Sequence, residues 1–393
     1  MNETVLPRLW SLVSPERLRE LTLGLVRIPS PTGDSRAVTE FYAQTVRALG
    51  VPVEVLEDYP SSPSTIARWG RAPGGPTLTL DGHLDTIHAP HVPPYEADGR
   101  IYGRGAGDMK SGIAAMVEAL RVLVESGVGL GGNVILATHS LHEAPVGHME
   151  GLRALIARGD VFTHAALVTE GGFDTLAIRG KGQALFEIEI TRPGEPLHEN
   201  VARPRGLPNP LDHAVALAAR LLEATRALAV ADDPLLGPET FFLGQIHGGD
   251  FYNRLPTRAF LNGVHRYWPD KSWAQIEERF HHLLASVERP AGLEVHLRLL
   301  SNGLGYEVPP ETPLVRALRQ GYRAVVGREL PLVGELSVSD VNVIVREAGI
   351  PAVGHGTGST TAHADLEWVS LADIVRTTKV YLATIVAYLG IKA

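Results

Sequence analysis

The order of apolar segments changes near residue 183, and this change constrains the fold more than any other feature of the sequence. Before it, short apolar runs at 77–80, 133–138 and 165–169 have the length of buried strands. Between the first two runs, apolar residues recur at helical spacing: Ile113, Met116, Val117, Leu120 and Val124. Strand, helix and strand in this order predict an α/β fold with an open mixed sheet and helices on both faces.

After residue 183 the order of segments is different. Strand-like and helix-like segments follow one another as β-α-β-β-α-β, at 184–191, 209–229, 241–249, 259–267, 272–288 and 293–300. This order predicts a separate ferredoxin-like unit. Helix and strand patterns of the first kind resume at 312–327 and 351–356. We therefore predict a large domain made of 1–182 and 298–393, with a smaller domain, 183–297, inserted into it.

Composition limits the class of protein and its partners. The chain has 393 residues, 44% of them apolar, which is enough to bury a core in each of two domains. A formal net charge of -8, without Lys and Arg clusters interleaved with aromatic residues, argues against nucleic acid. We find no signal peptide, and the apolar stretch at 380–391 is too short to span a bilayer, so no membrane partner is expected.

The absence of cysteine excludes disulfides and thiolate metal ligands. It also fits a reducing compartment, so we expect a cytoplasmic protein. Any metal site must therefore use His, Asp or Glu.

Acidic and histidine residues follow the apolar runs at the points where strands are expected to end: His83 and Asp85, Asp108, Glu143, Glu170 and His363. Open α/β sheets place their sites at the carboxyl ends of their strands, so these side chains are expected to meet at one edge. Two zinc ions that share a carboxylate need a set of oxygen and imidazole donors of this kind.

Taken singly, each of these patterns also fits a structure without a metal. A His-x-Asp pair such as 83 and 85 is more often a surface pair or a capped turn than a metal site. The glycine-rich stretch 103–107 could be taken for a nucleotide loop, but no clear strand leads into it, and Asp108 would repel a pyrophosphate. The segment 142–146 begins like the zinc protease motif H-E-x-x-H, but Val146 stands in place of the second histidine.

In their order along the chain, these segments resemble one family, the dizinc amidohydrolases and exopeptidases. It includes acetylornithine deacetylase, succinyl-diaminopimelate desuccinylase, aminoacylase, carnosinase and the glutamate-releasing carboxypeptidases. The resemblance covers nearly the whole chain and lies in GHLDT, GRGAGDMKSG, TEGG, GHGTGSTTAHADLEWV and the segments 181–210 and 247–269. It implies a zinc-exopeptidase-like catalytic domain at 1–182 and 298–393, and a lid and dimerisation domain at 183–297.

The resemblance also implies a ligand set for two divalent metal ions, taken as zinc, with cobalt or manganese as alternatives. His83, Asp108 and Glu170 would hold one ion, and Asp108, Glu143 and His363 the other, with Asp108 as the bridge. Asp85 would stand behind His83, where a carboxylate fixes the tautomer of a metal-binding imidazole. The family further implies a cis peptide bond between Asp108 and Met109.

Four more residues match positions of the family that act on the substrate: His198, Asn253, Arg266 and Gly356. His198 corresponds to a histidine that reaches the active site of a partner subunit, so we expect a homodimer formed through the lid. Asn253, Arg266 and Gly356 would hold the substrate, and a guanidinium suits a carboxylate because it binds both oxygens. For Arg266, an ion pair across the sheet is the alternative.

One position departs from the family, where a glutamate normally precedes the second-site ligand as the proton-transfer group. Here that position is His142. An imidazole can carry out acid-base catalysis near neutral pH, or His142 could only orient Glu143 or a substrate group. A local shift of the alignment would make His139, His148 or Glu150 the candidates instead.

Two functions follow. The first is a metallo-amidohydrolase or metallopeptidase of deacylase, desuccinylase or carboxypeptidase type, which hydrolyses an amide bond in a small molecule, an N-acyl amino acid or short peptide, with water activated between two metals. The alternative is a metal-binding relative without hydrolytic activity, acting as a binding or regulatory protein. The complete ligand set favours the enzyme. A serine hydrolase is disfavoured because the sequence has no G-x-S-x-G motif.

Overall fold

The computed structural model describes residues 5–70 and 72–392, which form two compact units. The first unit comprises the described residues of Met1–Ile178, Val308–Val333 and Val343–Ala393, and the second comprises Arg179–Glu307 and Gly334–Asn342. The second unit is thus an insertion in the sequence of the first. The limits of the inserted domain thus differ from the predicted limits of 183 and 297, and residues 334–342 belong to the second unit and not to the large domain.

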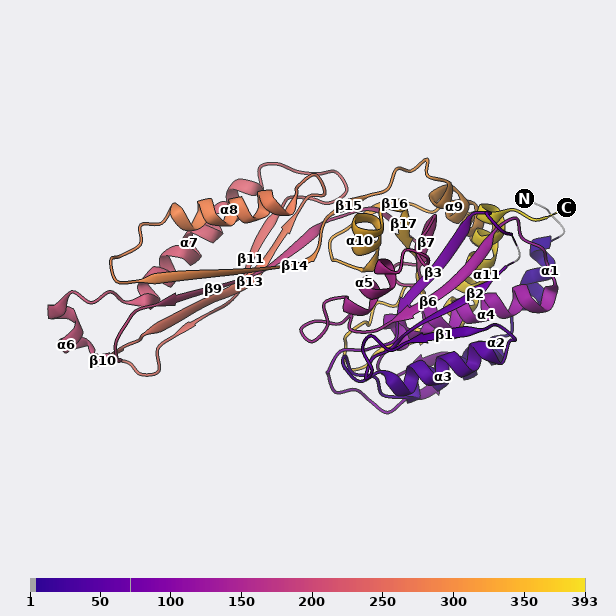
Figure 1. Cartoon of the computed structure of the whole chain (residues 1–393), viewed down its shortest axis with the longest axis horizontal. Coiled ribbons are helices and arrows are strands. Elements are labelled where there is room, and N and C mark those ends of the chain that lie inside the picture. The colour runs from indigo at the N-terminus through magenta and orange to yellow at the C-terminus, as the bar shows by residue number, and fades with distance from the viewer. Residues whose placement is uncertain (1–4, 71, 393) are drawn as a thin grey trace. The chain divides into compact units, whose positions relative to one another are not determined.

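A six-stranded mixed sheet is the centre of the first unit (Figure 1). Its strands lie in the order β1 (Val53–Leu56), β2 (Ser64–Trp69), β6 (Asn133–His139), β3 (Thr77–His83), β7 (Ala165–Val168) and β17 (Ala352–Gly354). The pairs β6–β3, β3–β7 and β7–β17 are parallel, whereas β1 and β2 join as antiparallel strands. The parallel strands therefore end at one edge, as the sequence analysis expected.

The central strands are buried on both faces. After its first residue, every position of β3 and of β6 is buried, and so are all four residues of β7. Strands covered on both sides have continuous apolar runs without alternation, which is the pattern that the sequence shows there.

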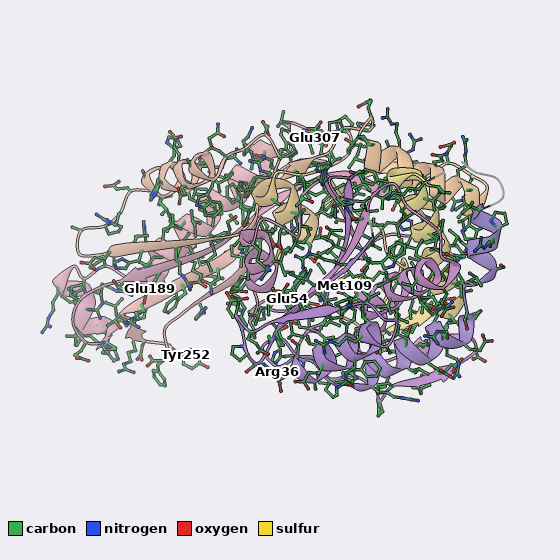
Figure 2. The ribbon with its side chains drawn as sticks, turned by 45° about the vertical axis from the view of Figure 1, so that its right-hand side comes forward. Arg36, Glu54, Met109, Glu189, Tyr252 and Glu307 are labelled. Atoms are coloured by element: carbon green, nitrogen blue, oxygen red, sulfur yellow. The ribbon has the colours of Figure 1, made fainter. Side chains whose placement is uncertain are left out.

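Helices cover this sheet: α1 (Val5–Ser11), α2 (Pro15–Arg27), α3 (Arg36–Arg47), α4 (Ser111–Ser126), α5 (Glu150–Ala157), α9 (Pro313–Val326) and α11 (Leu371–Leu389). The predicted helix between β3 and β6 is α4, which contacts β3 and α11 and is buried almost throughout its first three turns. Ser14 begins α2 as an N-cap, because its hydroxyl accepts a hydrogen bond from the Arg17 amide. Figure 2 shows Met109 inside this unit, immediately before α4.

The second unit has the predicted β-α-β-β-α-β order. Its elements are β9 (Gly182–Thr191), α7 (Pro210–Leu228), β11 (Thr240–Gly248), β13 (Arg258–Tyr267), α8 (Trp273–Ala285) and β14 (Glu294–Gly303). The four strands form an antiparallel sheet in the order β11-β13-β9-β14. Asn209 caps α7, and Ser272 and Gln275 form a capping box at the start of α8.

The core of the second unit lies between its sheet and its two helices. Along β9, buried and more exposed positions alternate, and the buried set includes Phe186, Ile188 and Ile190. Phe186 and Phe241 pack against Phe280 of α8, with ring centroids 5.3 and 5.4 Å from it. One face of this sheet is therefore apolar and covered, as is usual for antiparallel sheets.

Short elements complete the chain: β4 (Tyr95–Ala97), β5 (Arg100–Tyr102), β8 (Leu176–Gly180), β10 (Leu197–His198), α6 (Glu199–Ala202), β12 (Arg254–Leu255), β15 (Tyr306–Glu307), β16 (Leu332–Glu335), α10 (Asp340–Val343) and β18 (Trp368–Ser370). Helical turns cover Ala106–Lys110, Arg203–Arg205 and Ile344–Ala348. Within 5–70 and 72–392, no helix has the length and apolarity that a membrane crossing requires.

Candidate metal centre

The candidate ligands come from the carboxyl ends of the parallel strands. His83 is the last residue of β3, Glu143 follows the end of β6, and Glu170 lies two residues after β7. Asp108 lies in the turn before α4, where the backbone leaves helical geometry (φ -129°, ψ 96°). Because these strands are parallel neighbours, residues far apart in sequence reach the same edge of the sheet.

The carboxylate of Asp108 lies between two imidazoles. Its Oδ1 is 3.3 Å from Nε2 of His83, and its Oδ2 is 3.1 Å from Nε2 of His363. The same nitrogen of His363 is 3.0 Å from Oε1 of Glu143. Each oxygen of Asp108 thus faces a different histidine, which is the arrangement that a carboxylate bridging two cations requires. The peptide bond between Asp108 and Met109 is cis, and this confirms the prediction.

Two buried atoms of this group, Nε2 of His83 and Oδ1 of Asp108, face each other at 3.3 Å but make no hydrogen bond of good geometry among the described residues. Buried polar atoms nearly always have a partner, so a missing one needs a physical cause. Among the described residues, three sets of side chains have ligand atoms within 4.8 Å of one another, and two of them contain His83: one with Asp108 and Glu143, the other with His142 and Glu170. The donors are imidazoles and carboxylates, which suit zinc and related divalent ions. The residues present therefore fit a metal centre.

Charges around the site favour a cation. Burial opposes protonation of His83, but the adjoining carboxylates of Asp108, Asp85 and Glu143 raise its pKa well above the ordinary value. Contact with Asp108 and Glu143 raises the pKa of His363 to about 10. Burial disfavours the charged form of Asp108, but the two imidazoles lower its pKa below the ordinary range. A divalent ion would take the place of the protons on the imidazoles, so its binding releases protons.

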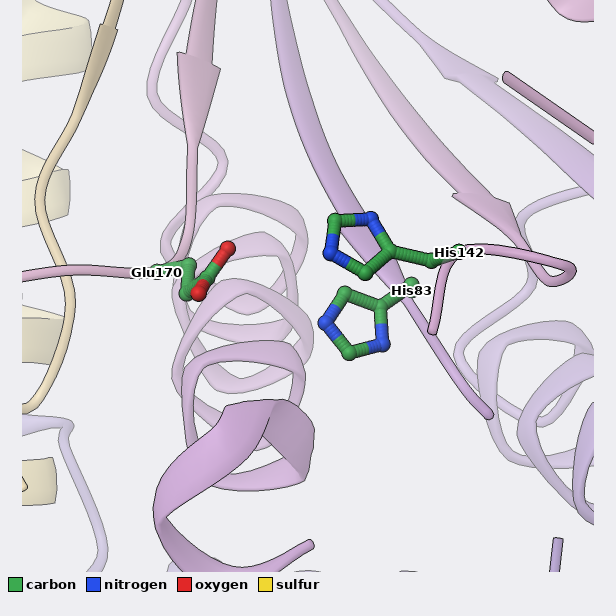
Figure 3. Close-up of side chains that lie close together, drawn as sticks. All are labelled: His83, His142 and Glu170. Carbon is green, nitrogen blue, oxygen red and sulfur yellow. The ribbon is translucent and has the colours of Figure 1, made fainter. Parts of the chain in front are cut away.

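His142 lies against His83. The two rings are nearly parallel, with planes 9° apart and centroids 3.9 Å apart, and the carboxylate of Glu170 faces them (Figure 3). An imidazole binds a metal ion through a lone pair that lies in the plane of its ring. One ion cannot lie in two parallel planes, so in this arrangement His142 is not a second imidazole ligand of the ion on His83.

Asp85 is buried behind the centre and holds the loop that follows β6. Its Oδ2 accepts hydrogen bonds from the amides of His142 (3.0 Å) and Glu143 (3.1 Å) and from the hydroxyl of Thr32 (2.8 Å). Nδ1 of His83 lies 3.0 Å from the backbone oxygen of Asp85 and 3.8 Å from its carboxylate. The main chain of Asp85 thus fixes the tautomer of His83, while its side chain positions the loop 142–143.

The three alternative candidates for the position of His142, which are His139, His148 and Glu150, have other contacts. His139 is buried, with its Nε2 3.5 Å from a carboxylate oxygen of Asp81. The amide of His148 donates to the carboxylate of Glu150, next to the start of α5. These contacts do not involve the group around Asp108.

Two glycines allow close packing around the centre. A Cβ atom on Gly112, in the first turn of α4, would lie 1.8 Å from the carbonyl oxygen of Thr169. A Cβ on Gly356 would lie 2.7 Å from the amide nitrogen of Gly171. Glycine at both positions lets α4 and the segment after β17 approach the turn that carries Glu170.

Of the residues matched to substrate binding, two lie together within the second unit. β10 and β12 pair through Leu197 and Leu255, and Nδ2 of Asn253 lies 2.9 Å from Nε2 of His198. Arg266 is elsewhere, on β13, where its guanidinium donates to the carbonyl oxygen of Leu336 (2.7 Å). Burial lowers the pKa of Arg266, and the nearby Glu335 opposes this shift.

Two charged residues next to this centre, Glu367 and Lys110, were not predicted from the sequence. Glu367 accepts hydrogen bonds from the segment that carries Asp108, and the amine of Lys110 donates to the carbonyl oxygens of Leu25 and Ile28 (both 3.0 Å). No local pattern in the sequence marks either residue, because the motifs that contain them hold other charged and polar residues as well.

Comparison with known proteins identifies relatives that match most of the chain. A family model described as peptidase family M20/M25/M40 matches residues 79–387. The chain is 28% identical over 402 residues to a succinyl-diaminopimelate desuccinylase of Methylobacterium radiotolerans, covering 95% of this chain and 97% of that one.

Solved structures share the fold. Human carnosine dipeptidase 1 has a TM-score of 0.78 at 16% identity, over 98% of this chain and 99% of that one. A dinuclear metal-binding peptidase of the M20 family from Bacillus subtilis has a TM-score of 0.70 at 14% identity, over 95% and 98% of the two chains. Both similarities extend over the first and the second unit.

Proposed function

Because the chain belongs to the peptidase family M20/M25/M40, it is a hydrolase of amide bonds, and we propose that it acts on an N-acyl amino acid or short peptide with two bound zinc ions. A binding protein without hydrolytic activity is not favoured, since a relative named as a desuccinylase and a structural neighbour named as a dipeptidase match 95% and 98% of the chain. One relative is named as a succinyl-diaminopimelate desuccinylase, so N-succinyl and N-acetyl amino acids are the first compounds to test.

The observation that carries this proposal is the position of the Asp108 carboxylate between His83 and His363, with one oxygen facing each imidazole. His83, Asp108 and Glu170 would hold one ion, and Asp108, Glu143 and His363 the other. When bound, these ions would polarise the scissile carbonyl and lower the pKa of an attacking water.

We assign proton transfer to His142. It occupies the position that a glutamate has in the family, and its backbone is held by Asp85. The ring of His142 is stacked on His83 and so is not placed to share the ion on that residue, and an imidazole can transfer protons near neutral pH. Gly356 would form part of the substrate pocket beside Glu170.

The remaining substrate contacts are assigned to the inserted unit, as part of a homodimer. His198 would polarise the scissile carbonyl in the partner subunit, Asn253 would position it, and Arg266 would bind the substrate carboxylate. A pairing surface is available on β11, an outer strand of its sheet, where Phe242 is 66% exposed and Ile246 is 42% exposed. Exposed apolar residues on an outer strand are typical of a surface that pairs with another chain.

The test is an assay of the purified protein, loaded with zinc, cobalt or manganese, against N-acyl amino acids and dipeptides. We expect release of a free amino acid from at least one compound, loss of activity on chelation and recovery when the metal is restored. Asp108→Asn should remove the activity. Metal-loaded protein that hydrolyses none of these compounds would contradict the proposed substrate class.

A further inference from the structure

Glu367 has an unusual number of partners on one short segment. Its Oε1 accepts hydrogen bonds from the amides of Gly107 (2.8 Å) and Asp108 (3.0 Å). Its Oε2 accepts from the amide of Gly105 (3.1 Å) and the guanidinium of Arg104 (2.9 Å). The backbone oxygen of Glu367 accepts a further bond from the amide of Gly103 (2.9 Å). The side chain is buried, at 1% exposed.

The segment 103–108 needs these bonds because it has little regular structure. Gly105 has a positive φ of 85°, and Asp108 departs from helical geometry inside the turn Ala106–Lys110. The amides at 105, 107 and 108, at the start of this turn, donate to the carboxylate of Glu367. A buried amide without an acceptor is costly, and one carboxylate supplies acceptors for all three. A Cβ at Gly107 would lie 2.2 Å from the hydroxyl of Ser359, so a larger residue does not fit there.

Glu367 also lies four residues after His363, the other ligand that faces Asp108. Its carboxylate therefore connects the turn of Asp108 to the segment of His363, across about 260 residues of sequence. The two oxygens of Glu367 accept hydrogen bonds from different parts of this segment. Oε1 accepts from the amide of Asp108, and Oε2 accepts from Arg104 and Gly105 at the start of the turn.

We propose that Glu367 is a positioning residue, which sets the orientation of the Asp108 carboxylate and its distance from His363 for binding of the metal pair. This inference rests on the proposed metal centre and adds a residue to it that binds no metal. Outer partners that orient metal ligands change metal affinity about 10- to 100-fold when they are removed.

The alternative is that Glu367 only satisfies buried amides, as many buried carboxylates do. Glu118 provides a matched control for that role. It lies in α4 of the same unit, is 3% exposed, and accepts from the amide of Ser14 (2.8 Å) and from the guanidinium of Arg121 (2.8 and 2.9 Å). Its contacts thus resemble those of Glu367 in burial and type, but none involves a candidate metal ligand.

The experiment compares Glu367→Gln, Glu118→Gln and wild type. An amide can present only one acceptor oxygen, so Gln at 367 loses one pair of hydrogen bonds. Metal-free protein is titrated with zinc against a chromophoric chelator, and the absorption spectrum is recorded at saturating cobalt. We expect Glu367→Gln to bind metal about 10- to 100-fold more weakly than wild type and to have an altered cobalt spectrum, while Glu118→Gln retains both wild-type properties.

Wild-type affinity and spectrum in folded Glu367→Gln would overturn the inference. So would equal weakening in both variants, because that would make the effect one of general stability. Should Glu367→Gln not fold, Glu367→Asp, which keeps the charge on a shorter side chain, is compared with Glu118→Asp by the same criteria. A wild-type protein that binds no metal would instead refute the metal centre, so the two failures can be told apart.

Discussion

At the scale of single residues, the site depends on two positions, of which one matches the family pattern and the other departs from it. Asp108 lies between His83 and His363, whereas His142 replaces a glutamate and stacks on His83. The first position is expected to determine whether metal binds, and the second whether the bound metal catalyses hydrolysis.

Replacement of Asp108 should affect both ions at once. We expect Asp108→Asn to retain fewer than one equivalent of metal per chain, because its carboxylate faces ligands of both sites. Glu170→Gln should lower the content from two equivalents to about one, since Glu170 is assigned to a single ion. Metal analysis after reconstitution and gel filtration measures this, and equal losses in the two variants would argue against a shared carboxylate.

Replacement of His142 separates catalysis from metal binding. We expect His142→Ala to keep both metals and to lower kcat about 10²- to 10⁴-fold, the usual contribution of a proton-transfer group. His142→Glu should retain activity, and His148→Ala, on the neighbouring turn, serves as the control. Near-full turnover by metal-loaded His142→Ala would show that this imidazole is not the base.

At the scale of elements, the strand β13 buries a histidine in the core of the second unit. His265 stacks on Phe241, with centroids 4.1 Å apart, its Nδ1 lies 3.0 Å from the carbonyl oxygen of Thr240, and its Nε2 lies 2.9 Å from the guanidinium of Arg279. Burial lowers the pKa of His265 to about 3, and the charge of Arg279 lowers it as well. The folded unit therefore holds this imidazole neutral.

This burial predicts how the stability of the second unit depends on pH. The unfolded chain takes up a proton at residue 265 near pH 6.5, and the folded unit takes it up only near pH 3. Because the unfolded state binds more protons between these values, the contribution of His265 to stability is complete above about pH 6.5 and decreases as the pH falls towards 3. His265→Gln lacks this pH-dependent contribution. The difference in free energy of unfolding between wild type and His265→Gln should therefore be largest at pH 7 and become smaller as the pH falls.

Hydrogen exchange of the amides in β9 and β13 between pH 4 and 7, corrected for intrinsic exchange rates, measures the difference. His296→Gln, at a 62% exposed position of the same sheet, should follow wild type throughout. A constant gap between wild type and His265→Gln over this range would refute the prediction.

At the scale of the whole molecule, the chain carries candidate metal ligands on one unit and candidate substrate contacts on an insertion within it. His198 and Asn253 lie together in the second unit, with a nitrogen of each 2.9 Å apart. If a partner subunit supplies them, an active site requires an intact metal centre from one chain and an intact lid from the other.

Subunit mixing tests this arrangement. His198→Ala and Glu143→Ala should each be inactive, and a mixture should recover part of the wild-type activity, because one of the two sites in a heterodimer is then complete. A mixture of His198→Ala with Asn253→Ala should recover no activity. Both residues lie in the lid, so each of the two sites in that heterodimer receives an altered lid. Proven exchange of subunits without recovery in the first mixture would exclude a shared site.

Local patterns in the sequence determined the elements, because hydrophobic periodicity depends only on neighbours along the chain. The continuous apolar runs of β3, β6 and β7 and the alternation in β9 are present in the sequence itself, and so is the β-α-β-β-α-β order of the insertion. The expectation that His83, Asp108, Glu143 and His363 meet also followed, since parallel strands end at one edge.

Only the tertiary structure decided which partner each side chain has, because those partners come from distant segments. Oε1 of Glu367 meets the amide of Asp108 across 259 positions, and no local pattern in GHGTGSTTAHADLEWV distinguishes that glutamate from a surface residue. In the same way, the carboxylate of Asp85 holds the loop at 142–143, and His142 stacks on His83, through packing that the sequence does not encode locally. A strand end predicts where a side chain arrives, but the burial and hydrogen bonds that orient it exist only once the segments have packed together.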